Sequence, residues 1–315
     1  MNIQQIQYLI ALDKYRNFSV AAEKMFVTQP ALTIQIKNLE EELGVKIFDR
    51  TKKAIIPTEI GKELIIQAHK LLKDTKKLKD IVSEFKADLS GELKVGIIPT
   101  VAPYIVPRFV NRFMEKYPKI NLIFSEVISE NILLQLKDGT LDAGILVTPF
   151  PMTDTIIFPL YYEKFYTYVS KKHPFIKRKK ISTTELDLQD LWLLEEGNCF
   201  RNQIINICTQ DVKYTNEGKF RYESVSIDSL MKIVDSSKGI TVIPEFAKML
   251  LPKEKKGMIK TFSDYFPVRE VSLIIDRTFL KRTIIEKLKE EIIKSVPKRM
   301  LKPDGELVST VIGEV

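Results

Sequence analysis

The two cysteines are the residues of this chain with the most evident chemistry. Cys199 and Cys208 lie in the segment 195–208. Asn198 can cap a helix that starts at about Cys199, because its side-chain oxygen can accept a first-turn N–H. A thiol in that turn meets the positive end of the helix dipole, and Arg201 adds a nearby positive charge. Both favour the thiolate, the nucleophile that attacks peroxide, so the sequence predicts a reactive Cys199.

The spacing of the two cysteines limits what they can do together. Cys208 follows Cys199 by nine residues, which in an intact helix separates the Cα atoms by ~13.5 Å along the axis. A disulfide requires Cα atoms within about 7 Å. The pair can therefore bond only if the helix between them unwinds, which would couple oxidation to a large conformational change. Two incidental buried thiols remain the alternative.

Composition places the chain among soluble globular proteins. With 315 residues, 44% hydrophobic and 29% charged, it is long enough for two or more domains. We expect it in the cytoplasm, because the N-terminal residues lack the pattern of a secretion signal and no segment is apolar enough for a membrane. A structural disulfide is then not expected. His69 and His173 have no metal-ligand spacing, so neither a metal, a cofactor nor an enzymatic triad is expected.

Apolar periodicity near the N-terminus predicts three helices. The first covers residues 3–12, and the second covers residues 20–25 with Ser19 as its N-cap. The third begins after the N-cap Thr28 and ends at Gly44. Its buried stripe is expected to consist of Leu32, Ile36, Leu39 and Leu43.

Two short helices joined by a tight turn form the geometry that reads base edges in the major groove of DNA. Any three-helix bundle gives the same periodicity, so a plain bundle stays open as the alternative. The net charge of +8 does not decide between them, because it is spread along the chain. The residues outside the buried stripe, and so expected to face DNA, are Thr28, Gln29, Pro30, Thr33, Ile34 and Lys37.

Residues 45–57 predict a β-hairpin, or wing, next to these helices. Its cations would lie against the phosphate backbone and add affinity without sequence information, although a solvated hairpin is also possible. These cations are Arg50, Lys52 and Lys53.

A long helix with a heptad seam is predicted from residue 58 to about residue 89. A seam this narrow needs a partner. We expect a second copy of the chain, with packing against the chain's own C-terminal domain as the alternative. The seam consists of Leu64, Ala68, Leu71, Thr75, Leu78, Val82 and Phe85.

Beyond residue 90, strand-like runs alternate with helical ones. This alternation predicts parallel-rich α/β structure, in two sheets because about 180 such residues would make one unusually wide sheet. Thr100 follows the first strand, where an anion or ligand would meet a helix N-terminus, or where it could be an N-cap. The expected strands cover residues 93–98, 120–127, 143–147, 165–169, 191–194, 240–243 and 271–275.

The N-terminal motifs resemble those of the LysR-type transcriptional regulators. The resemblance implies a winged helix-turn-helix at 1–58, a dimerising linker helix at 59–90, and a regulatory domain at 91–302 of periplasmic-binding-protein type. Its subdomains would cover 91–161 with 268–302 and 162–267, the chain would cross near Tyr162 and Pro267, and 303–315 would form a tail. Ile34 departs from the usual polar residue. The matching segments are 18–23 (FSVAAE), 28–33 (TQPALT), 36–40 (IKNLE), 43–44 (LG), 47–50 (IFDR), 57–58 (PT) and Gly61.

Further residues resemble the peroxide-sensing OxyR branch of that family. They are Gly96, Pro99, Thr100, Pro103, Tyr104, Pro107, Gly197, Cys199, Arg201, Gln203, Cys208, Ser226, Leu230, Val234, residues 239–241 and Pro244.

This second resemblance implies residue roles. Cys199 would be oxidised by peroxide to sulfenic acid and Cys208 would resolve it as a disulfide. Asn198 stands where several members have His, and it cannot shuttle a proton; Asn202 replaces an Asp. The peroxide pocket would comprise Thr100, Ser129, Asn198, Arg201 and Arg269.

The sequence thus predicts a peroxide-responsive DNA-binding regulator, an activator acting as a dimer of dimers. Its partners would be operator DNA, hydrogen peroxide, copies of itself and RNA polymerase. One alternative keeps the DNA-binding fold but places a small organic or inorganic effector in the cleft between subdomains. A second alternative is a thiol peroxidase that turns over with a reductant, which would leave the first ninety residues unexplained.

Overall fold

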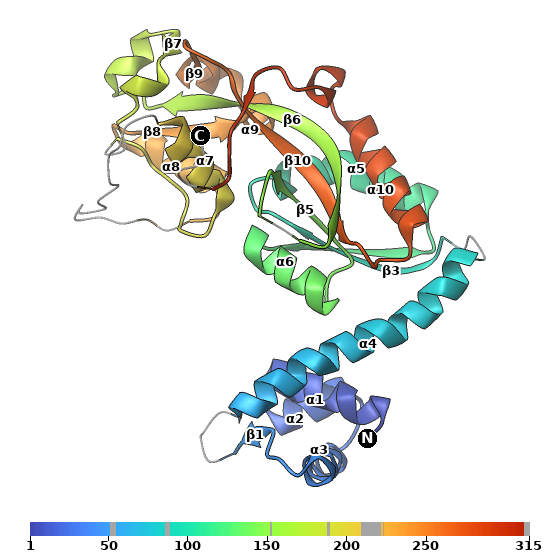
Figure 1. Ribbon diagram of the computed structural model, residues 1–315. Coiled ribbons are helices and arrows are strands. Elements are labelled where there is room, and N and C mark those ends of the chain that lie inside the picture. The colour runs from blue at the N-terminus through green and yellow to red at the C-terminus, as the bar shows by residue number, and fades with distance from the viewer. Residues whose placement is uncertain are drawn as a thin grey trace. The chain divides into compact units, whose positions relative to one another are not determined.

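The computed structural model describes residues 1–50, 55–85, 89–151, 153–187, 190–208, 222 and 224–311. Its contacts divide the chain into two compact units, one built essentially from residues 1–88 and the other from the rest (Figure 1). Across the described residues, no helix is both long enough and apolar enough to cross a membrane. Each unit has its own hydrophobic core.

The first unit begins with three short helices whose ends are set by local capping. They are α1 (Ile3–Tyr15), α2 (Phe18–Lys24) and α3 (Gln29–Leu43). Asn17 caps α2 by accepting the N–H groups of Ser19 and Val20, so the expected cap at Ser19 is wrong by two residues. Asparagine is at least as good an N-cap as serine, and here it comes earlier in the chain. Thr28 caps α3 and Gly44 ends it with φ +68°, both as predicted.

The buried face of α3 differs from the expected stripe at its C-terminal end. Leu32, Ile36 and Leu39 are fully buried, but Leu43 is 39% exposed. Glu40 takes its place in the core. Its carboxylate accepts the backbone N–H groups of Ile47 and Phe48 at 2.9 and 3.3 Å. The chain after Gly44 folds back over α3, and this turn brings peptide donors rather than apolar groups to that end of the helix.

The predicted wing is present as a two-stranded antiparallel ribbon, β1 (Phe48–Asp49) with β2 (Ile56–Pro57). Lys52 and Lys53 lie outside the described residues. The next helix begins against this ribbon, and Gly61 permits the approach, since a Cβ there would lie 2.1 Å from the carbonyl oxygen of Ile47.

The long helix α4 (Glu59–Phe85) is packed in the core of the first unit near its start and exposes apolar side chains further along. Ala68 is buried in the core of the first unit and Leu64 is packed against that core, so the expectation that both belong to a dimer seam is wrong. They pack inside the unit because α1 and α4 are neighbours. Further along, Leu78 and Val82 are 68% and 51% exposed, and Leu71 is also exposed. The side chain of Phe85 lies outside the described residues.

The second unit is mixed α/β. Its helices are α5 (Ala102–Lys116), α6 (Ser129–Asp138), α7 (Cys199–Ile207), α8 (Ile227–Ser236), α9 (Glu245–Leu250) and α10 (Arg282–Ser295), with short 3-10 turns η1 (Pro174–Lys177), η2 (Thr183–Glu185), η3 (Lys253–Met258) and η4 (Lys298–Leu301). Its strands are β3 (Gly91–Ile97), β4 (Ile120–Glu126), β5 (Ala143–Thr148), β6 (Thr155–Val169), β7 (Lys180–Ile181), β8 (Ile240–Pro244), β9 (Ile259–Phe262), β10 (Pro267–Asp276) and β11 (Glu306–Leu307).

Two long strands join the halves of this unit. The strand order is β4-β3-β5-β10-β6-β9-β7, with β8 beside β6 and β11 beside β10. Strand β3 is parallel to β4 and β5, but β10 is antiparallel to both β5 and β6. The expectation of a parallel-rich sheet therefore holds for β3, β4 and β5 and for the short pairs β7 with β9 and β10 with β11, but not for the long central strands. The chain leaves the first half of this unit through β6 and returns to it through β10, which is antiparallel to β5 and β6. Figure 1 shows β6 and β10 side by side. The crossing points expected near Tyr162 and Pro267 lie on β6 and β10.

Two strand predictions need correction. Residues 191–194 form only an isolated parallel bridge, from Leu191 to Ile240 of β8. The predicted strand 165–169 is the end of the much longer β6. The first half of β6 pairs with β10, which is about a hundred residues away in sequence. Neighbouring residues therefore give little indication of where β6 begins.

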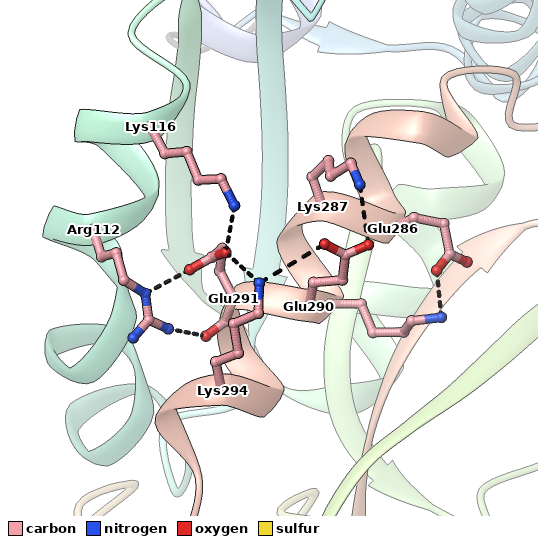
Figure 2. Close-up of polar contacts among 8 residues, drawn as sticks. Arg112, Lys116, Glu286, Lys287, Glu290, Glu291 and Lys294 are labelled. Carbon is pink, nitrogen blue, oxygen red and sulfur yellow. Dashed lines mark hydrogen bonds and ion pairs between the residues drawn. The ribbon is translucent and has the colours of Figure 1, made fainter.

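Helices α5 and α10 are joined by a cluster of charges around one carboxylate (Figure 2). Glu291 of α10 is almost fully buried and accepts from Arg112 at 2.5 Å and Lys116 at 3.1 Å, both on α5. Lys294 contributes a third contact at 3.0 Å. Burial would raise the pKa of Glu291, but the hydrogen bonds from these three cations lower it to about 2.

The segment expected to form a C-terminal tail is part of the fold. Strand β11 pairs in parallel with β10, and the N–H of Val308 donates to the carbonyl of Val268 at 2.9 Å. Figure 1 shows the dark red end of the chain running past α7. The tail expected at 303–315 therefore needs correction, since Val308 and Thr310 are buried in the second unit.

Candidate functional site

Helix α7 carries one cysteine in its first turn and the other at its end. The side chain of Asn198 accepts the N–H of Phe200, which confirms the predicted cap, and Cys199 is the first helical residue. Cys208 is the C-cap residue, and its N–H donates to the carbonyls of Ile204 and Ile205. Both thiols are free and buried. An ordered helix therefore separates the two sulfur atoms.

The hydroxyl of Ser129 is directed at the first thiol. Ser129 opens α6 and donates to Sγ of Cys199 across 3.4 Å, and both residues are buried. The two residues are seventy positions apart in sequence, and the contact brings the first residue of α6 to the first residue of α7. This contact joins one residue of the predicted peroxide pocket to the cysteine predicted to react with peroxide.

Burial dominates the electrostatics of Cys199. It raises the pKa of the thiol, while the hydrogen bond from Ser129 and the positive charge of Arg269 lower it to a smaller degree. The helix dipole and Arg201 were expected to favour the thiolate, but burial has the larger effect on the pKa of this thiol because it disfavours the charged form. Arg201 donates instead to the carbonyl of Leu194 at 3.2 Å.

Arg269 is the most unusual charged group of the site, since it is completely buried. Its guanidinium holds Oε1 of Glu163 at 2.6 and 2.9 Å. It also donates to the hydroxyl and the carbonyl of Thr100 at 3.1 and 3.0 Å. The guanidinium carbon lies 4.9 Å from the ring centre of Phe200, next to Cys199. Arg269 thus connects Thr100 to α7.

Of the two roles expected for Thr100, the helix N-cap is wrong. Thr100 does not cap α5, whose N-cap residue is Val101 and has no side-chain capping bond. Its hydroxyl oxygen accepts from Arg269 instead. A buried arginine needs acceptors for all its donors, and a hydroxyl and a carbonyl of one residue supply two of them.

No hydrogen bond or nearby positive charge lowers the pKa of Cys208 as Ser129 and Arg269 do for Cys199. Burial raises the pKa of the Cys208 thiol to about 12, and no other cause contributes. At neutral pH it is a thiol enclosed in apolar surroundings. Any reaction at Cys208 requires its release from this position.

The predicted DNA-facing residues lie along the start of α3. Gln29, Pro30, Thr33, Ile34 and Lys37 are exposed or half-buried, with Ile34 at 55%. The hydroxyl of Thr33 donates to the carbonyl of Gln29 at 2.8 Å, and Ser19 donates to the amide oxygen of Gln29 at 3.3 Å. The oxygen of Thr28 is engaged in capping. Arg50 pairs with the buried Glu40 at 3.0 Å, so its charge is shared between the wing and the core.

Among the buried carboxylates that sequence reasoning missed, Glu163 and Glu40 contact the predicted site residues Arg269 and Arg50. Glu163 meets Arg269 across 106 residues, and nothing near Glu163 in sequence signals that partner. Glu40 carries a weak signal, because it directly follows Leu39 and lies one turn from Ile36 on the apolar face of α3. A carboxylate at such a position predicts a buried acceptor.

Two family models match the chain. Residues 3–62 match the bacterial regulatory helix-turn-helix protein, lysR family, and residues 86–294 match the LysR substrate binding domain. A hydrogen peroxide-inducible genes activator of Haemophilus influenzae is 34% identical over 269 residues, covering 85% of this chain and 87% of the relative. The DNA-binding transcriptional dual regulator OxyR of Escherichia coli is 34% identical over 256 residues, covering 81% and 82%.

Solved structures agree with this assignment. A full-length variant of OxyR from Pseudomonas aeruginosa matches with TM-score 0.73 and 30% identity, covering 93% of this chain and 98% of that one. OxyR from Porphyromonas gingivalis matches with TM-score 0.64 and 32% identity, covering 70% and 100%. The full-length match spans nearly the whole chain, whereas the second match spans about two thirds of it. The chain therefore belongs to the LysR family of DNA-binding transcriptional regulators, and it is OxyR-like.

Proposed function

We propose that this regulator senses hydrogen peroxide by forming a disulfide between Cys199 and Cys208. The observation that carries the proposal is the placement of the two cysteines at opposite ends of α7, with the Ser129 hydroxyl directed at the first. The relatives named as hydrogen peroxide-inducible genes activators support it. A pair held apart by a helix cannot bond by chance, so the disulfide would report a change of conformation.

The chemistry balances in two steps. The Cys199 thiolate attacks one peroxide oxygen, the O–O bond breaks, and the departing hydroxide takes a proton to become water, leaving a sulfenic acid. The sulfur of Cys208 then attacks the sulfenic sulfur. The S–O bond breaks, and the hydroxide takes the thiol proton of Cys208 to leave as a second water. One peroxide is reduced and two thiols are oxidised, with no other reductant needed.

The buried residues around Cys199 would serve the first step. Ser129 donates to the sulfur and stabilises the thiolate. Thr100 accepts from Arg269, which leaves the proton of its own hydroxyl to donate to a peroxide oxygen. Asn198 is engaged as the cap of α7 and has no titratable proton, so its part is to hold the helix start in place. These residues, with Arg201 at the helix surface, form the pocket that we propose.

Disulfide formation would be transmitted to DNA through oligomerisation. Unwinding α7 would repack the second unit, and the exposed Leu71, Leu78 and Val82 of α4 supply the face by which two chains would pair. Two such dimers would place their α3 helices in successive major grooves of the operator. Gln29 and Thr33 would read base edges, Ile34 would contact a thymine methyl, and Lys37 with Arg50 would contact phosphates.

The test is a disulfide map of the full-length protein before and after a peroxide pulse at micromolar concentration. We expect the 199–208 pair in the wild type, and no peroxide-dependent change of the operator footprint in Cys199→Ser, which should still bind DNA when reduced. A pair that stays reduced would refute the proposal. If Cys199→Ser is still induced, and a metabolite raises the melting temperature, a small effector is the signal instead.

A further inference from the structure

The last described residues of the chain lie along the redox helix and bind its amide side chains. The amide nitrogen of Gln203 donates to the carbonyl of Val308 at 2.9 Å, and that of Asn202 donates to Thr310 at 3.1 Å. Asn206 donates twice, to the carbonyls of residues 309 and 311 at 3.0 and 2.8 Å. Three side chains spread over more than one turn of α7 therefore hold four consecutive carbonyls.

The same segment is fixed to the crossing strand on its other side. Glu306 and Val308 donate their N–H groups to β10 carbonyls or to the residue just before β10, each at 2.9 Å. The hydroxyl of Thr310 donates to the carbonyl of Pro149, after β5. Val308 and Thr310 are buried. Residues 306–311, which we call the C-terminal strap, thus connect α7 to the part of the unit that carries β5 and β10.

We propose that the C-terminal strap holds α7 helical in the reduced protein and so sets how readily Cys208 can reach an oxidised Cys199. This inference rests on the proposed function and adds its regulation. A helix of nine residues is marginal on its own, because helix nucleation is costly and short helices depend on packing. Contacts made only by the intact helix raise the free energy of unwinding it.

Helix α7 also contains a polar atom that weakens its packing. The side-chain oxygen of Gln203 is buried and has no hydrogen-bond partner among the described protein groups, although its nitrogen binds the strap. An unsatisfied buried acceptor costs free energy in the folded helix and regains water when the helix opens. The strap bonds therefore offset a cost that the folded helix carries.

The two oxidation steps should respond differently to the strap. Formation of the sulfenic acid at Cys199 needs no unwinding, since the thiol is attacked where it lies. Attack by Cys208 needs the helix to open, and opening breaks the four bonds to the strap. Weakening the strap should speed disulfide formation and leave the first step unchanged.

Two variants of the full-length protein test this. The first is Asn206→Asp, which keeps the shape of the side chain but replaces a donor of two bonds by an acceptor facing two carbonyls. The second ends the chain after Gly305 and so removes the strap. The control is Asn131→Asp, which makes the same change of charge at an exposed position of α6. Hydrogen exchange of α7 amides is measured in the reduced proteins, without peroxide.

We expect exchange in α7 to be about thirtyfold faster in Asn206→Asp, as two lost hydrogen bonds of ordinary strength would give, and unchanged in the control. After a peroxide pulse, dimedone trapping should give the same rate of sulfenic acid formation in both, with faster disulfide formation in Asn206→Asp. Unchanged α7 exchange in Asn206→Asp would overturn the inference, even if the truncated chain is globally destabilised. Faster exchange in a protein that peroxide never oxidises would support the strap and refute peroxide sensing.

Discussion

The hydroxyl of Ser129 lies 3.4 Å from the sulfur of Cys199 and donates to it, although the two residues begin different helices in different parts of the second unit. A hydroxyl donor stabilises a thiolate more than a thiol, because the hydrogen bond is stronger to a charged acceptor. This contact lowers the pKa of a thiol that burial raises. The Ser129 hydroxyl contacts the sulfur directly, so a change at Ser129 should alter the reactivity of Cys199.

Replacing Ser129 by Ala should slow the oxidation of Cys199. The thiolate loses its donor, its pKa rises further, and we expect sulfenic acid formation at pH 7 to fall by roughly tenfold, the effect of about 1.4 kcal/mol. Ser129→Thr keeps the hydroxyl and is the matched control. The rate is followed by dimedone labelling in a Cys208→Ser background. Equal rates in the Ala and Thr variants would show that the hydroxyl has no part in the reaction.

The same rate should depend on pH in a defined direction. Burial raises the pKa of Cys199 above its usual value of 9.0, so only a small fraction is thiolate at neutral pH. We expect the oxidation rate of the folded protein to rise about tenfold per pH unit from pH 6 to about pH 9. A flat profile over this range would mean that the thiolate is already formed. Far-UV circular dichroism at each pH confirms that the protein stays folded.

Removing one member of the buried pair Arg269 and Glu163 should destabilise the fold more than removing both. Arg269→Leu leaves a buried carboxylate without its partner and should lower the free energy of unfolding by ~3–5 kcal/mol. Burial already raises the pKa of Glu163, against the opposing charge of Arg269. The double variant with Glu163→Leu should recover much of the loss. Urea unfolding of all four proteins closes the cycle, and strictly additive losses would contradict this account.

Glu291 should make stability depend on acid. Its pKa is held at about 2, against 4.5 for an ordinary Glu. A lowered pKa stabilises the fold above about pH 4.5, and this contribution disappears as the pH falls through about 2. Glu291→Gln should therefore lower the melting temperature at pH 7 and have little effect near pH 2.

The neighbouring Glu290 provides the comparison for that variant (Figure 2). Its side chain is 41% exposed, so Glu290→Gln should change the melting temperature much less because water screens its ion pairs. Equal losses for the two variants at pH 7 would show that burial of Glu291 does not matter.

Polar substitutions on the exposed part of α4 should prevent pairing of two chains without unfolding either. Leu78→Asp with Val82→Asp removes the apolar groups that we expect at the interface, and sedimentation should then give a monomer. Ala68→Asp is the contrasting variant, because Ala68 is in the core of the first unit and the change should unfold that unit instead. A dimer that survives the double substitution would place the interface elsewhere.

The sequence by itself determined the features that depend on neighbours along the chain. The caps at Thr28 and Asn198, the stop at Gly44, and the helix carrying the two cysteines follow from local hydrogen bonding and apolar spacing. The motifs around α3 identified the family for the same reason, since their residues lie close together in sequence.

Tertiary structure alone decided which distant groups meet. The pairing of Arg269 with Glu163 and Thr100 and the packing of the strap on α7 join residues about a hundred or more positions apart. No local pattern encodes such partners. The state of the Cys199 thiol was also decided there, because the desolvation that keeps it protonated depends on everything packed around it.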